Sequence, residues 1–311
     1  MRKRVIVVAG ISVVVILTVL SYMFSLYGDL AGELKLNASG KKVAVVDVYG
    51  EIADTTGILR QLHTYERMNS VRSIVIRINS PGSQGLAASQ EVYGKIRKIT
   101  ALGKPVVVSM NNIAASGAYY IASAADKIVA NSGTLTGSIG VILAFATAKE
   151  LMEKIGVNYV TVSSGKYKDI GNFSREATEQ EKDVLKELIN EARDIFVRDI
   201  VDVRHEALAE SAGIKEEDIE KRKAIVRKYV SANIADGRIF TGETAKRLGL
   251  VDEIGGIDEA IELAAKLAGI DGRPSVIKEK EQVKFADWLA RAFSGITINA
   301  QIPGLSGIIL K

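Results

Sequence analysis

Cysteine is absent from the 311 residues, and histidine occurs only twice, at His63 and His205. The lack of cysteine excludes a thiol nucleophile, a cysteine-ligated metal and any disulfide. Two histidines are too few for a histidine-rich metal cluster, and a Ser-His-Asp triad would have to use one of them. Neither histidine has a neighbouring carboxylate in a motif-like setting, so the sequence gives such a triad no direct support.

A surplus of one charge sign is also lacking. The chain has 41 Lys+Arg against 37 Asp+Glu, a formal net charge of +4. Arg2, Lys3 and Arg4 supply three of these charges, so the rest of the chain is close to neutral. Nucleic-acid binding needs a basic face, and we therefore expect no nucleic-acid partner. Apolar residues at 47% and charged residues at 25% are typical of a globular chain.

A long, uncharged and predominantly apolar run is present at residues 5–28, behind the basic residues 1–4. As a helix it spans roughly 36 Å, enough for a bilayer core of about 30 Å. A cleaved signal peptide is the alternative, but its apolar stretch is usually about 7–15 residues long. We expect an uncleaved, single-pass transmembrane anchor in the cell membrane. The basic residues in front and Asp29 and Glu33 behind it favour a cytoplasmic N-terminus and an extracytoplasmic body.

The body, after a polar linker at 29–42, alternates between strand and helix patterns. β-branched apolar runs predict buried strands at about 42–52, 73–78, 105–110, 127–131 and 157–162. Amphipathic patterns predict helices at about 87–99, 147–155, 178–204, 216–230, 242–248 and 257–268. The longest begins with a capping box, Thr178 to Glu181. This order indicates an α/β fold with mostly parallel strands and a helical C-terminal segment. In the tail, residues 271–311, the uncharged run between Arg291 and Lys311 is too polar for a second membrane span.

Ser116 is the candidate nucleophile. It follows the strand at 105–110, at the start of a helix of small residues, where free N–H groups face a substrate. The turn at 79–83 ends the neighbouring strand and would present a further N–H. Small residues at such a junction also serve packing alone. For the base, Lys166 and Lys168 lie just past a predicted strand end, and burial can lower a lysine pKa enough for this role. Solvated loop lysines are the alternative.

Five short motifs occur in order: RINSPG (77–82), AASGAYYIA (114–122), TGSIGV (136–141), SGKYKDIG (164–171) and GRIFTGETAKRLGLVDEIGG (237–256). With these motifs the chain resembles the signal peptide peptidases of the short SppA type, serine proteases with a Ser/Lys dyad. The resemblance covers about residues 43–270. It implies a protease domain with a ClpP/crotonase-like ββα spiral fold and a helical C-terminal segment, preceded here by one N-terminal transmembrane helix.

The resemblance also implies a role for each matching residue. Ser116 would be the nucleophile and Lys168 the general base, with Lys166 a minor candidate, and Ser138 would orient the lysine amine.

The oxyanion hole would be formed by backbone N–H groups, one from Gly117 and one from Gly82 or Ser83. The family commonly has Gly-Gly after the proline, whereas this chain has Gly82-Ser83. A backbone N–H survives that difference, but a side chain and a narrower range of φ are added.

The implied function is that of a membrane-anchored serine endopeptidase that cleaves remnant signal peptides and other apolar peptides through an acyl-enzyme. It calls for no metal, nucleotide or organic cofactor. Long members of the family carry two copies of the domain, so a single copy implies a homo-oligomeric ring, with the dyad completed across subunits as a hypothesis. Two alternatives share the fold: a crotonase-class acyl-CoA enzyme and a catalytically inactive membrane scaffold.

Overall fold

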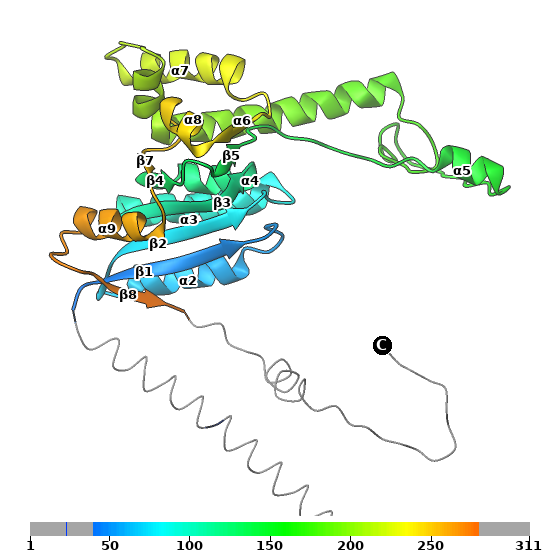
Figure 1. Cartoon of the computed structure of the whole chain (residues 1–311). Coiled ribbons are helices and arrows are strands. Elements are labelled where there is room, and N and C mark those ends of the chain that lie inside the picture. Colours follow the sequence, from blue (N-terminus) through cyan, green and yellow to red (C-terminus); the bar gives the residue numbers. More distant parts are fainter. Residues whose placement is uncertain (1–22, 24–39, 280–311) are drawn as a thin grey trace, which may run out of the picture. The chain divides into compact units, whose positions relative to one another are not determined.

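The computed structural model describes Met23 and residues 40–279, and its centre is an eight-stranded sheet (Figure 1). The strands are β1 (Lys42–Tyr49), β2 (Val71–Ser80), β3 (Val106–Ala115), β4 (Lys127–Ala130), β5 (Leu135–Gly137), β6 (Ile239–Thr241), β7 (Glu253–Ile254) and β8 (Ser275–Lys278). Their order is β6-β5-β3-β2-β1-β8, and β4 pairs with β3 and β7 off this path. Among these pairings β5–β6 alone is antiparallel, so the expected α/β fold with mostly parallel strands is confirmed.

Helices cover both faces of the sheet. They are α2 (Thr56–Arg67), α3 (Leu86–Ala101), α4 (Gly117–Ser123), α5 (Lys149–Lys154), α6 (Glu179–Ser211), α7 (Ile219–Asn233), α8 (Gly242–Arg247) and α9 (Ile257–Leu267). Helix α9 packs its alanines on one face, against a buried cluster that includes Val43, Val75 and Val107. The other face packs against α2, α3, α4 and α6. Strands buried on both faces have continuous apolar sequences, which is why they were predictable.

The predicted strand at 157–162 is wrong. No strand forms there, and Val160 and Val162 are 82% and 93% exposed. A β-branched run becomes a strand only where a neighbouring strand supplies backbone hydrogen bonds, and no strand of the described part of the chain pairs with this run. Lys166 and Lys168 therefore follow a segment without regular secondary structure rather than a strand end.

At the C-terminal side the sheet continues further than expected. Strand β8 pairs in parallel with β1, from Lys42 opposite Ser275 to Val45 opposite Lys278. The folded unit thus extends beyond the boundary that we set at residue 270. The rest of the predicted tail, from residue 280, lies outside the described residues.

The predicted anchor at 5–28 lies outside the described residues except for Met23. The same is true of residues 1–4 and of most of the linker. In the region from residue 40 to residue 279, none of the helices combines the length and the apolar character that crossing a bilayer requires.

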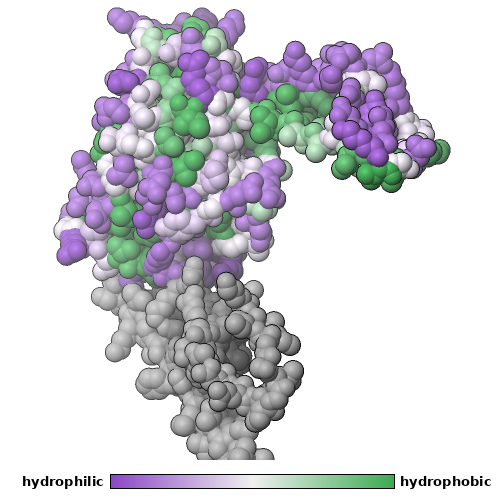
Figure 2. Space-filling model, turned by 45° about the vertical axis from the view of Figure 1, so that its right-hand side comes forward, coloured by the Kyte–Doolittle hydropathy of each residue, from purple (hydrophilic) through white to green (hydrophobic). Residues whose placement is uncertain are grey.

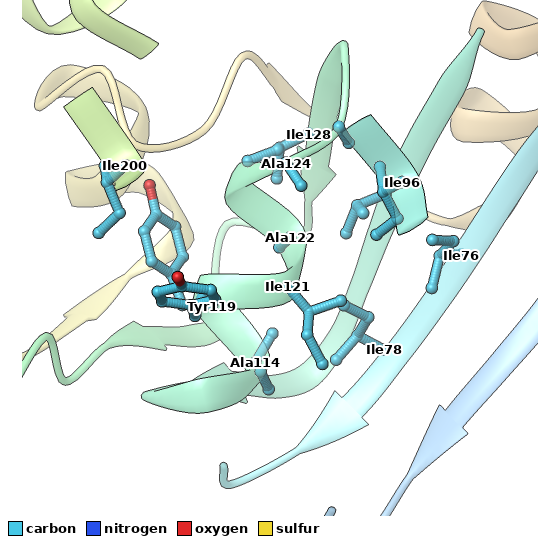
Figure 3. Close-up of a cluster of buried hydrophobic side chains, with 14 of the residues drawn as sticks. Ile76, Ile78, Ile96, Ala114, Tyr119, Ile121, Ala122, Ala124, Ile128 and Ile200 are labelled. Carbon is cyan, nitrogen blue, oxygen red and sulfur yellow. The ribbon is translucent and has the colours of Figure 1, made fainter. Parts of the chain in front are cut away.

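Strand β3 changes partners along its length, and this change creates the functional region. Residues Val107–Met110 pair with β4, whereas Ile113–Ala115 pair with β5. Helix α4 starts directly afterwards, and all seven of its residues are buried. Figure 3 shows Ile121 of this helix packed among Ile78 and Ile96 of the neighbouring elements. The start of α4 is therefore fixed from several sides.

Candidate active site

Ser116 lies between β3 and α4 and is the N-cap residue of that helix. Its backbone has φ 52° and ψ −125°. In the described part of the chain, Ser138 is the one other non-glycine residue with a positive φ, at 50°. Such a conformation costs on the order of 1–3 kcal/mol and is concentrated at functional sites. The two serines that the motifs single out are thus also the two held in strained backbone.

The strands bring these two serines together. Ala115 is paired with Gly137, and the Ser116 N–H donates to the Gly137 carbonyl at 2.9 Å. The Ser138 N–H donates to the Arg238 carbonyl at 2.8 Å. Both serines are half-buried, so each can meet a substrate from solvent.

The turn after β2 lies against Ser116. A Cβ added to Gly82 would be 3.2 Å from Ser116 Cβ and 3.6 Å from its Oγ, and Gly82 has a φ of 147°. The Gly82 N–H donates to Ser80 Oγ at 3.2 Å. Within residues 40–279 no hydrogen-bond acceptor is assigned to the N–H of Ser83 or of Gly117. Of the three backbone N–H groups considered for the oxyanion hole, these two have no acceptor within the described residues.

The space around residue 117 leaves room for a glycine but not for a side chain. An added Cβ would lie 2.6 Å from Ser89 Oγ and 2.8 Å from Ser83 Cβ, and it would overlap Ser83 Oγ. The structure thus brings five of the six predicted site residues together: Gly82, Ser83, Ser116, Gly117 and Ser138.

Lys168, the sixth, lies elsewhere. It is exposed on a turn in the segment between β5 and α6, where its backbone N–H donates to the Gly165 carbonyl at 3.1 Å. Its side chain makes no hydrogen bond within residues 40–279. Lys166 is also exposed, with Nζ 5.1 Å from the ring centroid of Tyr167. The single chain does not bring either lysine to Ser116.

The segment that carries both lysines, residues 141–177, is called the arm below. In Figure 1 it leaves the sheet after β5 and carries α5, none of whose residues is buried. Figure 2 shows hydrophobic side chains gathered on its surface. The exposed large apolar residues of the arm are Ile142, Leu143, Phe145, Leu151, Ile155, Val157, Tyr159, Val160, Val162, Tyr167 and Phe173. Between the arm and α6 lies a groove of about 490 Å³, lined by residues that include Phe145 and Ile189.

An ion cluster ties the Lys168 turn to the start of α6. Arg175 bonds both carboxylate oxygens of Asp169, at 2.9 and 3.1 Å, and both of Glu181, at 2.6 and 2.8 Å. Glu181 also accepts from the Thr178 N–H at 2.8 Å and completes the predicted capping box. The Arg175 and Thr178 bonds lower the pKa of Glu181 to about 2, and Arg175 also lowers the pKa of Asp169.

Sequence reasoning missed Arg175, Asp169 and Ser89. Arg175 stands three residues before the capping box, and this spacing was the available signal. Ser89 lies in the first turn of α3, and nothing in its local sequence marks it.

The two histidines lie away from Ser116. His63 Nδ1 is 2.9 Å from Lys95 Nζ, and His205 Nδ1 accepts from Arg222 at 3.2 Å. Burial lowers the pKa of His205. A triad through either histidine has no geometric support.

Comparison with known proteins identifies the family. The model of peptidase family S49 matches residues 98–233 and 216–271. The chain belongs to peptidase family S49. A relative from Synechocystis sp., slr0021, is named as a protease. It is 41% identical over 233 residues, 74% of this chain and 76% of that protein. The chloroplastic serine protease SPPA of Arabidopsis thaliana is 32% identical over 251 residues, 76% of this chain and 34% of that protein.

A solved structure of the membrane-bound stomatin-specific protease 1510-N matches 78% of this chain and 99% of that chain, with 16% identity and a TM-score of 0.44. The S49 relatives agree with the SppA-type resemblance and make this chain a serine protease. Between the three functions considered from sequence, the family thus favours the peptidase over the acyl-CoA enzyme and the inactive scaffold.

Proposed function

We propose that this S49 peptidase cleaves remnant signal peptides and other apolar peptides, with Ser116 as nucleophile and Lys168 as general base. The observation that carries the proposal is the strained, half-buried Ser116 in contact with Gly82 and paired beside Ser138. A ClpP/crotonase-like spiral fold belongs to the same proposal. Its support is the mostly parallel sheet, which ends at one edge with the short strands β5 and β6.

The chemistry uses side chains and backbone of the protein alone. Neutral Lys168 takes the proton from Ser116 Oγ, which attacks the scissile carbonyl. The oxyanion is bound by the N–H of Gly117 and that of Ser83; Gly82 is the weaker candidate because its N–H already donates to Ser80. Lys168 then protonates the leaving amine, and water hydrolyses the acyl-enzyme.

Ser138 has the role of orienting the lysine amine through its hydroxyl. Its support is its place beside Ser116, given by the pairing of Ala115 with Gly137. In this scheme Ser116 and the Lys168 that activates it do not come from the same chain.

A second copy of the chain is the proposed source of that lysine. The arm exposes many large apolar side chains, which is typical of an interface rather than of a solvated surface. The groove between the arm and α6 offers a further apolar contact for a neighbour. We propose a closed homo-oligomeric ring in which the arm of one subunit delivers Lys168 to Ser116 of the next.

Membrane attachment completes the proposal. The uncharged run at 5–28 anchors the chain with its N-terminus in the cytoplasm and the protease domain outside. Protease digestion of intact and permeabilised cells tests this topology, and digestion of the body only after permeabilisation of the cell membrane would contradict it.

The test of the chemistry uses the full chain in detergent micelles with small apolar fluorogenic peptides. Ser116→Ala and Lys168→Ala should each lose activity by about 10³-fold or more, while Lys166→Ala, on the same turn, serves as the matched control. A fluorophosphonate should label Ser116, located by mass spectrometry. Because the base must be neutral, wild-type activity should rise with pH; a flat profile from about pH 6 to about pH 10 would contradict a lysine base.

A further inference from the structure

Two serine hydroxyls meet beside the proposed oxyanion site. Ser83 Oγ and Ser89 Oγ are 2.8 Å apart, and Ser83 Oγ also donates to the Gly85 carbonyl at 2.9 Å. Ser83 is half-buried in the turn after β2, and Ser89 is fully buried in the first turn of α3. The pair therefore joins the turn to the helix that follows it.

The hydrogen positions follow from the partners. A hydroxyl has one hydrogen to donate, and the Gly85 carbonyl can only accept. Ser83 thus donates to Gly85, and Ser89 donates to Ser83. Within residues 40–279 Ser83 is the partner assigned to the Ser89 hydroxyl, so the bond to Ser83 satisfies a buried polar group that would otherwise be costly.

The same two hydroxyls form the wall next to Gly117. A Cβ added to Gly117 would meet three atoms, Ser83 Oγ, Ser89 Oγ and Ser83 Cβ. The turn is held from its other side by Ile52, whose N–H donates to the Gly82 carbonyl at 2.9 Å. The Ser83 and Ser89 side chains therefore fill the space directly beside Gly117, and the turn is held by side-chain packing as well as by this backbone bond.

We infer that the Ser83–Ser89 hydroxyl pair is a positioning device that fixes the Ser83 and Gly117 N–H groups for the oxyanion. The inference rests on the proposed function. It assigns a role to the side chain that this chain has where the family commonly has a second glycine. With Ser83 in place, the turn loses the conformational freedom that glycine would give it, and the donors are preorganised before the substrate binds.

The experiment compares Ser83→Ala, Ser83→Gly and Ser89→Ala in the full chain, with Ser89→Thr as the conservative variant. Ser123→Ala is the matched control. Ser123 is as buried as Ser89, and its hydroxyl donates to the Tyr120 carbonyl at 2.7 Å, a bond inside α4. Three quantities are measured: kcat, KM, and inhibition by a peptide aldehyde and by the matching peptide alcohol. The aldehyde forms a tetrahedral adduct that uses the oxyanion hole, whereas the alcohol does not.

A complete loss of one oxyanion donor lowers kcat by about 10²–10³-fold, so a displaced donor should lower it by about tenfold. We expect that loss in Ser83→Ala, Ser83→Gly and Ser89→Ala, with KM and alcohol binding within about twofold and aldehyde binding weakened in parallel with kcat. Ser89→Thr should recover most of the activity, and Ser123→Ala should match the wild type.

Three results would separate failure of the positioning role from failure of the proposed function. If the wild type is active and Ser116→Ala inactive, but the Ser83 and Ser89 variants behave like Ser123→Ala, the positioning role is overturned and the proposed function stands. The same conclusion follows if KM rises and aldehyde and alcohol binding fall together. If Ser116 is neither labelled nor needed in the wild type, the proposed function itself fails.

Discussion

The N–H of Ser116 donates to the carbonyl of Gly137, the residue directly before Ser138, at 2.9 Å. This backbone hydrogen bond joins the segments of the two strained serines, since Ser116 directly follows β3 and Ser138 directly follows β5. The consequence is that a change at Ser138 can act through its hydroxyl or through its backbone, and these two effects are separable.

Ser138→Ala removes the hydroxyl and keeps the strain, whereas Ser138→Gly removes both. We expect the two variants to lose activity to the same extent, by about 10–10²-fold, if the hydroxyl orients the lysine. Ser138→Gly should be the more stable of the two by up to about 1 kcal/mol, because glycine adopts a positive φ without steric cost. Peptidase assays and urea unfolding measure the two effects. Activity retained in Ser138→Ala would remove the hydroxyl from the mechanism.

Mixed oligomers test whether the dyad is shared between subunits. Ser116→Ala and Lys168→Ala proteins should each be inactive alone. After dissociation and joint reassembly in equal amounts, roughly a quarter of the sites would pair an intact Ser116 with an intact Lys168 from a neighbour. Recovery of activity to about that fraction of the wild type is the expected result. A mixture as inactive as its components would place the dyad within one chain.

Acid should loosen the Lys168 turn through Glu181 and Asp169. Both have a pKa lowered in the folded state, that of Glu181 to about 2. The stability from these groups is therefore fully present above their ordinary pKa values of about 4 and is lost as pH falls from there towards about 2. The hydrogen-exchange protection factors of residues 166–178, which correct for the intrinsic pH dependence of exchange, should fall over this range before those of the core strands.

Arg175→Ala should produce that loosening already at neutral pH, because it removes the partner of both carboxylates. Arg193→Ala is the matched control, since Arg193 forms an exposed ion pair with its neighbour Asp194 in the same helix. Equal exchange in the two variants would show that the cluster does not hold the turn.

The arm should be the part of the surface on which assembly depends. Val160→Asp and Val162→Asp place a charge on two of its most exposed apolar residues. A charge buried in an interface without a partner is strongly unfavourable, so the ring should dissociate and activity should fall with it. Sedimentation velocity measures the state. Ile219→Asp on α7 is the control, because Ile219 is 52% exposed outside the arm. An unchanged sedimentation coefficient in the arm variants would place the interface elsewhere.

Sequence patterns predicted the fold wherever burial is decided within the chain. Strands β1 to β4 and helices α3 and α6 to α9 were predictable, since their apolar periodicity matches a sheet covered on both faces. The very short strands β5, β6 and β7 were not, because two or three residues carry no periodic signal. The run at 157–162 was misjudged because its pattern is the same whether a partner lies in this chain or in another.

The candidate site was predictable in part for a related reason. The motifs singled out Ser116, Ser138 and Gly117, and the strand register of β3 and β5 brings these residues near one another. Contacts between side chains far apart in sequence, such as Ser83 with Ser89 against Gly117, have no sequence period that reveals them. Lys168 lies on the exposed arm, apart from these residues, and no motif spacing gives its distance from Ser116.

Helix α4 has no solvent-facing side, since every residue from Gly117 to Ser123 is buried, whereas α5 has no buried residue. Directed evolution of this peptidase would therefore find almost no position that accepts a larger side chain in the seven residues behind the nucleophile. New substrate preferences would have to come from substitutions in exposed segments such as α5.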